Sequence, residues 1–198
     1  MSDYLKFVGS ETTFNSRIWG ELTVESVSFT PASDGDLVVY FNTPLNVDRP
    51  LVRIHSECVF AEIFDSDFCD CADQLYYALE DLKNSPGGIL FYLRFDGRGA
   101  GLSAKVKATA LEMSGMDTYD SRVEIGVAPE GRNFENIAQF LIAKGIRKIT
   151  LLTNSPNKVN DLAKHGIDVE TKSLIVSDAN ENVKKLYDTK SKRFGHKI

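Results

Sequence analysis

Three cysteines lie within fourteen residues of this chain, as Cys58, Cys69 and Cys71, and the rest of its 198 residues contain none. Thiolates are good zinc ligands, and three protein ligands leave the fourth tetrahedral position free for water, as in catalytic zinc sites. Water held in that position ionises near neutral pH and becomes a nucleophile. The cluster therefore predicts one catalytic Zn2+ ion per chain.

Three other interpretations fit the same cluster. The thiols can pack as small apolar side chains in a core, or they can form a structural zinc site with His55 as the fourth ligand. The sequence His55-Ser-Glu57 also matches the His-x-Glu of zinc deaminases, although their Pro-Cys-x-x-Cys motif is absent. Cys71 follows Asp70, which can cap a helix, and a helix N-terminus lowers the pKa of a thiol. That placement favours the metal site.

Hydrophobic periodicity places these residues on a succession of strands and helices. Strands are predicted at residues 18–27, 37–41, 51–54, 89–93, 148–152 and around 169. Helices are predicted after Asp70, at 102–113, at 134–144 and after Ser155. Turn residues fill 31–36, and residues 115–133 lack a clear period, which is typical of a functional loop. The predicted class is α+β, a mixed β-sheet core with flanking helices.

One domain is predicted for residues 1–198, because 42% hydrophobic residues in a chain of this length supply one good core. It comprises a β-rich N-terminal part at 1–48, a zinc- and nucleotide-binding core at 49–175 and a polar, lysine-rich C-terminal segment at 176–198. The net charge of -5 argues against nucleic-acid or membrane partners, which are bound by broad basic surfaces. No signal-peptide pattern or long apolar run is present, so we expect a cytoplasmic protein with reduced cysteines.

A glycine-rich turn, Asp96-Gly-Arg-Gly-Ala-Gly101, joins a predicted strand to a predicted helix. Glycines let backbone N–H groups approach phosphate oxygens, and the helix N-terminus favours an anion. The turn also fits an ordinary strand-to-helix connection. A locally basic pocket in this acidic chain would be formed by Arg94, Arg98, Arg132 and Lys158.

Taken in order, these motifs resemble the GTP cyclohydrolase II family. The likeness rests on Val52-Arg-Ile-His-Ser-Glu-Cys58 and on Cys69-Asp-Cys71 with Gln74, and it extends over residues 15–198. The resemblance implies a homodimeric hydrolase that opens the imidazole ring of GTP, or of a close purine nucleotide, at C8. It implies formate, pyrophosphate and a diaminopyrimidine ribosyl phosphate as products, and Mg2+ bound with the substrate phosphates. That reaction begins riboflavin synthesis.

The resemblance also implies roles for the matching residues. The three cysteines would bind zinc, Glu130 would accept a proton, and Arg132 would act as the nucleophile at the α-phosphate. Because a guanidinium is almost never deprotonated in proteins, a phosphate clamp is the simpler role for Arg132. The expected nucleotide-binding residues are Arg53, Ile54, His55, Ser56, Glu57, Gln74, Asp96, Gly97, Arg98, Thr118, Thr153 and Lys158.

Several positions depart from the family pattern. Thr109, which we assign to the catalytic set with Glu130 and Arg132, stands where the family has a tyrosine. Glu130 and Asp96 replace an aspartate and a glutamate. Because a threonine hydroxyl does not reach as far as a phenol, a second hypothesis is a paralogue that keeps the formyl group on its product or takes a modified purine nucleotide. A third hypothesis is a zinc-stabilised guanine-nucleotide-binding protein without turnover.

Overall fold

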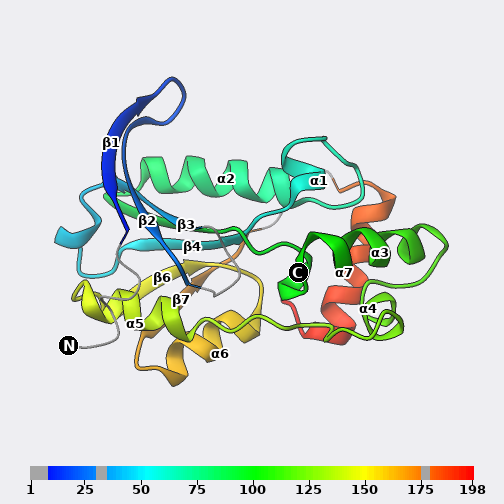
Figure 1. The fold of residues 1–198 in the computed structure, drawn as a ribbon. Helices are drawn as coiled ribbons and strands as arrows, with labels where there is room; N and C mark the ends of the chain where they lie inside the picture. The colour runs from blue at the N-terminus through cyan, green and yellow to red at the C-terminus, as the bar shows by residue number, and fades with distance from the viewer. Residues whose placement is uncertain (1–8, 30–34, 175–178) are drawn as a thin grey trace.

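The polypeptide is organised around one mixed sheet of seven strands (Figure 1). The computed structural model describes residues 9–29, 35–174 and 179–198. The strand order is β1-β2-β3-β5-β4-β6-β7. The pairs from β1 to β5 are antiparallel, whereas β5, β4, β6 and β7 run parallel. This mixed sheet with flanking helices confirms the predicted α+β class.

Every strand predicted in the described residues is present. The strands are β1 Glu11–Ser16, β2 Gly20–Val27, β3 Asp36–Asn42, β4 Leu51–Ser56, β5 Gly87–Leu93, β6 Lys148–Leu152 and β7 Asp168–Lys172. Strand β1, whose side chains are almost all exposed, was not predicted, because it has no buried face to impose a hydrophobic alternation. The predicted turn at 31–36 falls mostly outside the described residues.

Helices flank the sheet and extend beyond one end of it (Figure 1). They are α1 Val59–Glu62, α2 Cys71–Asn84, α3 Gly101–Met113, α4 Asp120–Glu124, α5 Glu135–Ala143, α6 Pro156–Lys164 and α7 Glu181–Phe194, with 3-10 turns at Pro44–Asn46 and Gly97–Gly99. One expectation was wrong: the segment predicted as a loop contains α4. The polar C-terminal segment, for which no helix was predicted, contains α7. Asp70 precedes α2 as predicted, but its side chain does not cap the helix.

The two faces of the sheet bury separate apolar clusters. Helix α2 covers one face, and α5 and α6 cover the other (Figure 1). Because successive strand residues point to opposite faces, Val52 and Ile54 of β4 enter the α5/α6 cluster while Arg53 and His55 point to the α2 side. None of the helices in residues 9–29, 35–174 and 179–198 is long and apolar enough to cross a bilayer.

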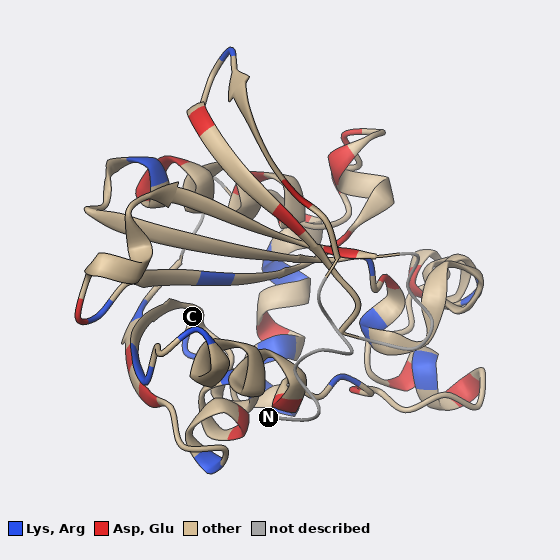
Figure 2. Ribbon diagram, turned by 60° about the vertical axis from the view of Figure 1, so that its left-hand side comes forward, with Lys and Arg blue, Asp and Glu red and all other residues tan. Residues whose placement is uncertain are grey.

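Strands β4, β5 and β6 end at the same edge of the sheet, and helices α1, α3, α4 and α7 gather beyond that edge (Figure 1). Ligand sites in parallel sheets form where the carboxyl ends of the strands meet. Lysine, arginine, aspartate and glutamate residues are spread over many elements of the ribbon (Figure 2). Any concentration of positive charge at this edge therefore depends on a few particular side chains.

Candidate metal centre and substrate cavity

The three cysteines converge at this edge of the sheet. Cys58 follows β4 at the start of α1, and Cys71 is the first residue of α2. Their Sγ atoms and that of Cys69 all lie within 4.8 Å of one another, and Cys58 Sγ lies 3.6 Å from Cys69 Sγ. A Zn–S bond of about 2.3 Å places tetrahedral sulfur ligands about 3.8 Å apart. The cluster therefore fits a zinc ion with little movement.

The three thiols are close enough to change one another's pKa values. Hydrogen bonds from Cys69 and Cys71 lower the pKa of Cys58 far below that of an ordinary thiol. The pKa of Cys69 is raised to about 11, and its hydrogen bond with Cys58 is the largest cause. Among the described residues, the ligand atoms that lie close enough to share a metal are those of the three cysteines and not of His55, whose Nε2 lies 2.9 Å from Glu62 Oε1. A structural site closed by His55 is therefore not what the geometry supports.

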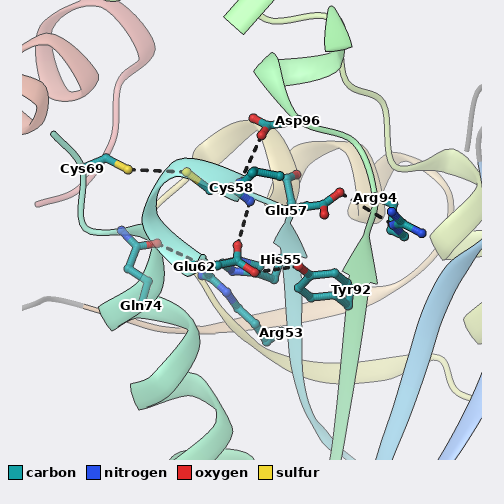
Figure 3. A network of polar contacts seen from close by, with 12 residues as sticks. Arg53, His55, Glu57, Cys58, Glu62, Cys69, Gln74, Tyr92, Arg94 and Asp96 are labelled. Atoms are coloured by element: carbon teal, nitrogen blue, oxygen red, sulfur yellow. Dashed lines mark hydrogen bonds and ion pairs between the residues drawn. The ribbon is translucent and has the colours of Figure 1, made fainter. Parts of the chain in front are cut away.

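Glu62 connects the first cysteine to the sheet (Figure 3). Its Oε1 accepts the backbone N–H of Cys58 at 2.7 Å and lies against His55, and its Oε2 accepts the hydroxyl of Tyr92 at 2.6 Å. Burial alone would raise the pKa of Glu62, but hydrogen bonds from His55 and Tyr92 lower it. Sequence reasoning missed this residue, because an isolated glutamate near a metal motif looks like a surface charge.

The cluster opens into a cavity of about 960 Å³ that most of the predicted residues line. Those lining it are Arg53, His55, Ser56, Glu57, Cys58, Cys69, Cys71, Gln74, Asp96, Gly97, Arg98, Thr109, Thr118, Arg132, Thr153 and Lys158. Three predicted residues are not among them. The Ile54 side chain lies in the core, Glu130 is hydrogen-bonded to Arg132, and Arg94 is exposed with its Nε 3.8 Å from Glu57. The basic pocket thus forms without Arg94.

Two cations are buried at the base of the cavity. Arg53 donates to the carbonyl of Leu152 at 3.0 Å and to Gln74 Oε1 at 2.9 Å, and Lys158 donates to the carbonyl of Ile54 at 2.8 Å. Burial lowers the pKa of Arg53 to about 10 and lowers that of Lys158 well below its ordinary value. Cations held in so little water attract an anionic ligand strongly.

Helix α7 forms another wall of the cavity, and sequence reasoning did not foresee it. Asp70, only 1% exposed, accepts hydrogen bonds from Gln74 Nε2 and from the Tyr187 hydroxyl, both at 2.6 Å. Its other oxygen lies 3.4 Å from Lys190 Nζ. The residue between two of the cysteines therefore attaches α7 to the cluster.

Comparison with known proteins agrees with this arrangement. The family model for GTP cyclohydrolase II matches residues 8–173. The chain belongs to the GTP cyclohydrolase II family. It is 44% identical over 152 residues to GTP cyclohydrolase-2 of Psychromonas ingrahamii, covering 75% of this chain and 74% of that protein. It is 37% identical over 177 residues to the riboflavin biosynthesis protein RibBA of Bacillus subtilis, covering 88% of this chain and 44% of that protein.

The family is one of enzymes, and the present chain is a GTP cyclohydrolase II-like enzyme. A solved structure, RibBX, a two domain 3,4-dihydroxy-2-butanone 4-phosphate synthase from A. baumannii, aligns with 86% of this chain and 40% of that chain. The TM-score is 0.42 and the identity is 16%.

Two residues of the predicted catalytic set, Glu130 and Arg132, form a close pair. Arg132 donates through Nε to Glu130 Oε1 at 2.7 Å and through Nη2 to Glu130 Oε2, while its Nη1 donates to Ser56 Oγ at 3.1 Å. Burial would raise the pKa of Glu130, but the bonds from Arg132 lower it. Because both carboxylate oxygens are engaged, Glu130 is placed to orient Arg132.

The glycine-rich loop positions this pair. Gly131 N–H donates to the carbonyl of Arg98 at 3.1 Å. A Cβ at Gly99 would lie 3.1 to 3.2 Å from the Phe95 ring and from Gly131, so this crossing requires glycine. Arg98 itself has a φ of 56° in the left-handed region and stacks on Phe194 at 4.4 Å. The loop is therefore more than a plain strand-to-helix connection.

The far end of the cavity contains an ion pair that the sequence did not reveal. Arg122 Nη1 lies 2.6 Å from Glu112 Oε1 and 3.2 Å from Thr118 Oγ1. All three line the cavity, as does Thr109 one turn before Glu112 on α3. In an aperiodic segment Arg122 has no local pattern that separates it from a solvated charge.

Proposed function

We propose that this chain hydrolyses GTP at C8 of the guanine ring, in the reaction that begins riboflavin synthesis. Two water molecules would open the imidazole ring and release C8 as formate. A third would cleave the bond between the α- and β-phosphates and release pyrophosphate. The product would be a diaminopyrimidine ribosyl phosphate. The observation that carries the proposal is the trio of cysteine sulfurs at the wall of a cavity lined by buried cations.

Cys58, Cys69 and Cys71 would hold one zinc ion, which supplies a Lewis acid that activates water for attack on a carbon as unreactive as C8. Glu62 contributes by fixing the backbone at Cys58 and by accepting a hydrogen bond from His55. With its Nε2 proton directed at Glu62, the buried His55 ring stays neutral, because burial lowers its pKa. These residues give the cluster a fixed orientation toward the cavity.

The phosphate groups would be held by Arg98, Arg132 and Lys158. A guanidinium matches the geometry of a phosphate and remains protonated, so Arg132 is best suited to clamp the α-phosphate during attack by water. Glu130 would keep Arg132 in position for this role, because both of its carboxylate oxygens accept hydrogen bonds from the guanidinium. Mg2+ would bind with the substrate phosphates, since it is usually held by phosphates and few protein ligands. We also propose a homodimer, as the family resemblance implies.

A second candidate is a paralogue whose pyrimidine product retains the formyl group, and Thr109 favours it. This residue lines the cavity one helical turn after Lys105, which contacts Cys58. Its hydroxyl makes no hydrogen bond within residues 9–29, 35–174 and 179–198. If the family tyrosine assists the second hydrolysis, a short hydroxyl at this position slows that step while ring opening and pyrophosphate release continue.

One assay separates these possibilities. Purified protein is incubated with GTP, Zn2+ and Mg2+, and formate, pyrophosphate and the ultraviolet spectrum of the product are followed together. Formate and pyrophosphate in equal amounts support the first candidate. Pyrophosphate with a formylated pyrimidine supports the second, and Thr109→Tyr should then restore formate. Tight GTP binding without any product would contradict both and indicate a binding protein. Cys69→Ser is the control, since it should remove the metal and all turnover.

A further inference from the structure

We propose that Lys105 is a positioning residue of the metal centre: Asp96 holds its ammonium group against the sulfur of Cys58, where it balances thiolate charge. The inference deepens the proposed function and rests on it only in taking the three cysteines as metal ligands. Lys105 was visible in the sequence as part of a helix, and nothing in that helix's periodicity connects it with a cysteine 47 residues earlier.

The contact is direct and shielded from water. Lys105 Nζ lies 3.0 Å from Cys58 Sγ and 2.8 Å from Asp96 Oδ1. The side chains of Lys105 and Asp96 are only 11% and 8% exposed. The ring of Phe60 covers the ammonium, with its centroid 4.9 Å from Nζ. An ammonium group removed from water needs acceptors for its protons, and a carboxylate and a sulfur supply them here.

Asp96 is fixed by backbone groups from two different loops. Its Oδ2 accepts the N–H of Val59, the residue after Cys58, at 3.2 Å, and its Oδ1 accepts the N–H of Gly97 at 2.6 Å. Figure 3 shows Asp96 pointing toward the segment that carries Cys58. Both oxygens are thus occupied. The resemblance implies that Asp96 binds the nucleotide. Its contacts show that it connects the loop after β4 with the loop after β5 and forms an ion pair with Lys105.

The consequence is electrostatic. Three thiolates and a divalent cation have a net charge of minus one, and the ammonium group, held by Asp96, offsets part of that negative charge where it lies, at the sulfur of Cys58. A hydrogen bond to a thiolate withdraws electron density from sulfur, so the metal receives less charge and becomes a stronger Lewis acid. In the described part of the chain, no lysine or arginine donates a hydrogen bond to Cys69 or Cys71. This hydrogen bond therefore acts on the sulfur of Cys58.

The test uses Co2+ added to the metal-free full chain, because its thiolate-to-metal charge-transfer band reports the donor strength of the sulfurs without any turnover. Lys105→Gln should move this band to longer wavelength than in the wild type, since an uncompensated thiolate gives up an electron more easily. Asp96→Asn, which releases the ammonium, should move it in the same direction. Lys105→Arg should leave it closer to the wild-type position. GTP turnover by the zinc form of Lys105→Gln should fall about 10- to 100-fold.

Lys107→Gln is the matched control, because Lys107 is exposed two positions further along the same helix. It should leave the band and turnover unchanged. A wild-type band position in both Lys105→Gln and Asp96→Asn would overturn the inference, and so would an equal shift in Lys107→Gln. The role of Lys105 and the proposed function can fail independently. If the wild-type protein forms products and Lys105→Gln behaves identically, only the role of Lys105 is refuted. Wild-type protein that binds neither Co2+ nor Zn2+ refutes both.

Discussion

Replacing Asp70 by alanine should cost the protein about 3 kcal/mol in free energy of unfolding. Removing one partner from a buried ion pair costs about 3–5 kcal/mol, because the other is left without compensation. The lower end applies here, since Asp70 is almost fully buried but lies 3.4 Å from the partly exposed Lys190. Gln74 and Tyr187 also lose their acceptor. For a chain of this size, about 3 kcal/mol corresponds to a fall in Tm of about 6–12 °C.

The measurement is calorimetry and urea unfolding of the metal-free protein, so that metal binding does not contribute to the difference. Asp67→Ala, an exposed position three residues earlier, is the matched control and should change stability by less than about 0.5 kcal/mol. Tyr187→Phe combined with Asp70→Ala should show a coupling of about 1 kcal/mol in a double-mutant cycle. A loss below about 1 kcal/mol in Asp70→Ala, or strict additivity in the cycle, would refute the reasoning.

Three further predictions concern the site. Glu62→Gln preserves the shape of the side chain but should weaken zinc binding about 10- to 100-fold in a chelator competition. The reason is that His55 and the backbone N–H of Cys58 lose a charged hydrogen-bond acceptor. Burial lowers the pKa of His196 to about 4, so stability should fall as the pH drops from about 6.5 to 4, by at most about 3 kcal/mol, and His196→Gln should remove that slope. Arg132 holds the pKa of Glu130 below its ordinary value, so the ionised Glu130 stabilises the folded protein at neutral pH. This stabilisation is lost as the pH falls through the folded-state pKa of Glu130. The Glu130→Gln variant should therefore have a lower free energy of unfolding than wild type at pH 7, and the difference should shrink in acid.

The cysteine cluster was predictable because the spacing of the three residues in the sequence is itself the signal. The strand-loop-helix pattern around Cys58 and Cys71 places both at element ends, and the structure confirms those positions. Strand β6 was predicted with its observed bounds, because Lys148–Leu152 is a short apolar run between a glycine turn and a serine-proline helix start.

What the sequence could not reveal depends on contacts between distant segments. Lys105 and Glu62 acquire their roles from contacts with residues distant in the sequence, which no sequence pattern assigned to them. Helix α7 was missed because its apolar positions, Val183, Leu186, Tyr187 and Phe194, are few among many charged residues and only Val183 is buried. Arg94 was expected at the cavity because it is a charged residue close to the glycine-rich turn, but neither charge nor position in the sequence fixes the direction of a side chain.

The attachment of α7 to the cysteine loop also bears on how the protein is made. Tyr187 follows Asp70 by 117 residues, so a nascent chain already contains all three cysteines long before the wall that encloses them has been synthesised. During that interval the thiols are open to oxidation and to metals other than the intended one. A truncation before α7 would keep all three cysteines and still leave the cavity without one side, so an intact cysteine cluster alone is a poor measure of correctly finished protein.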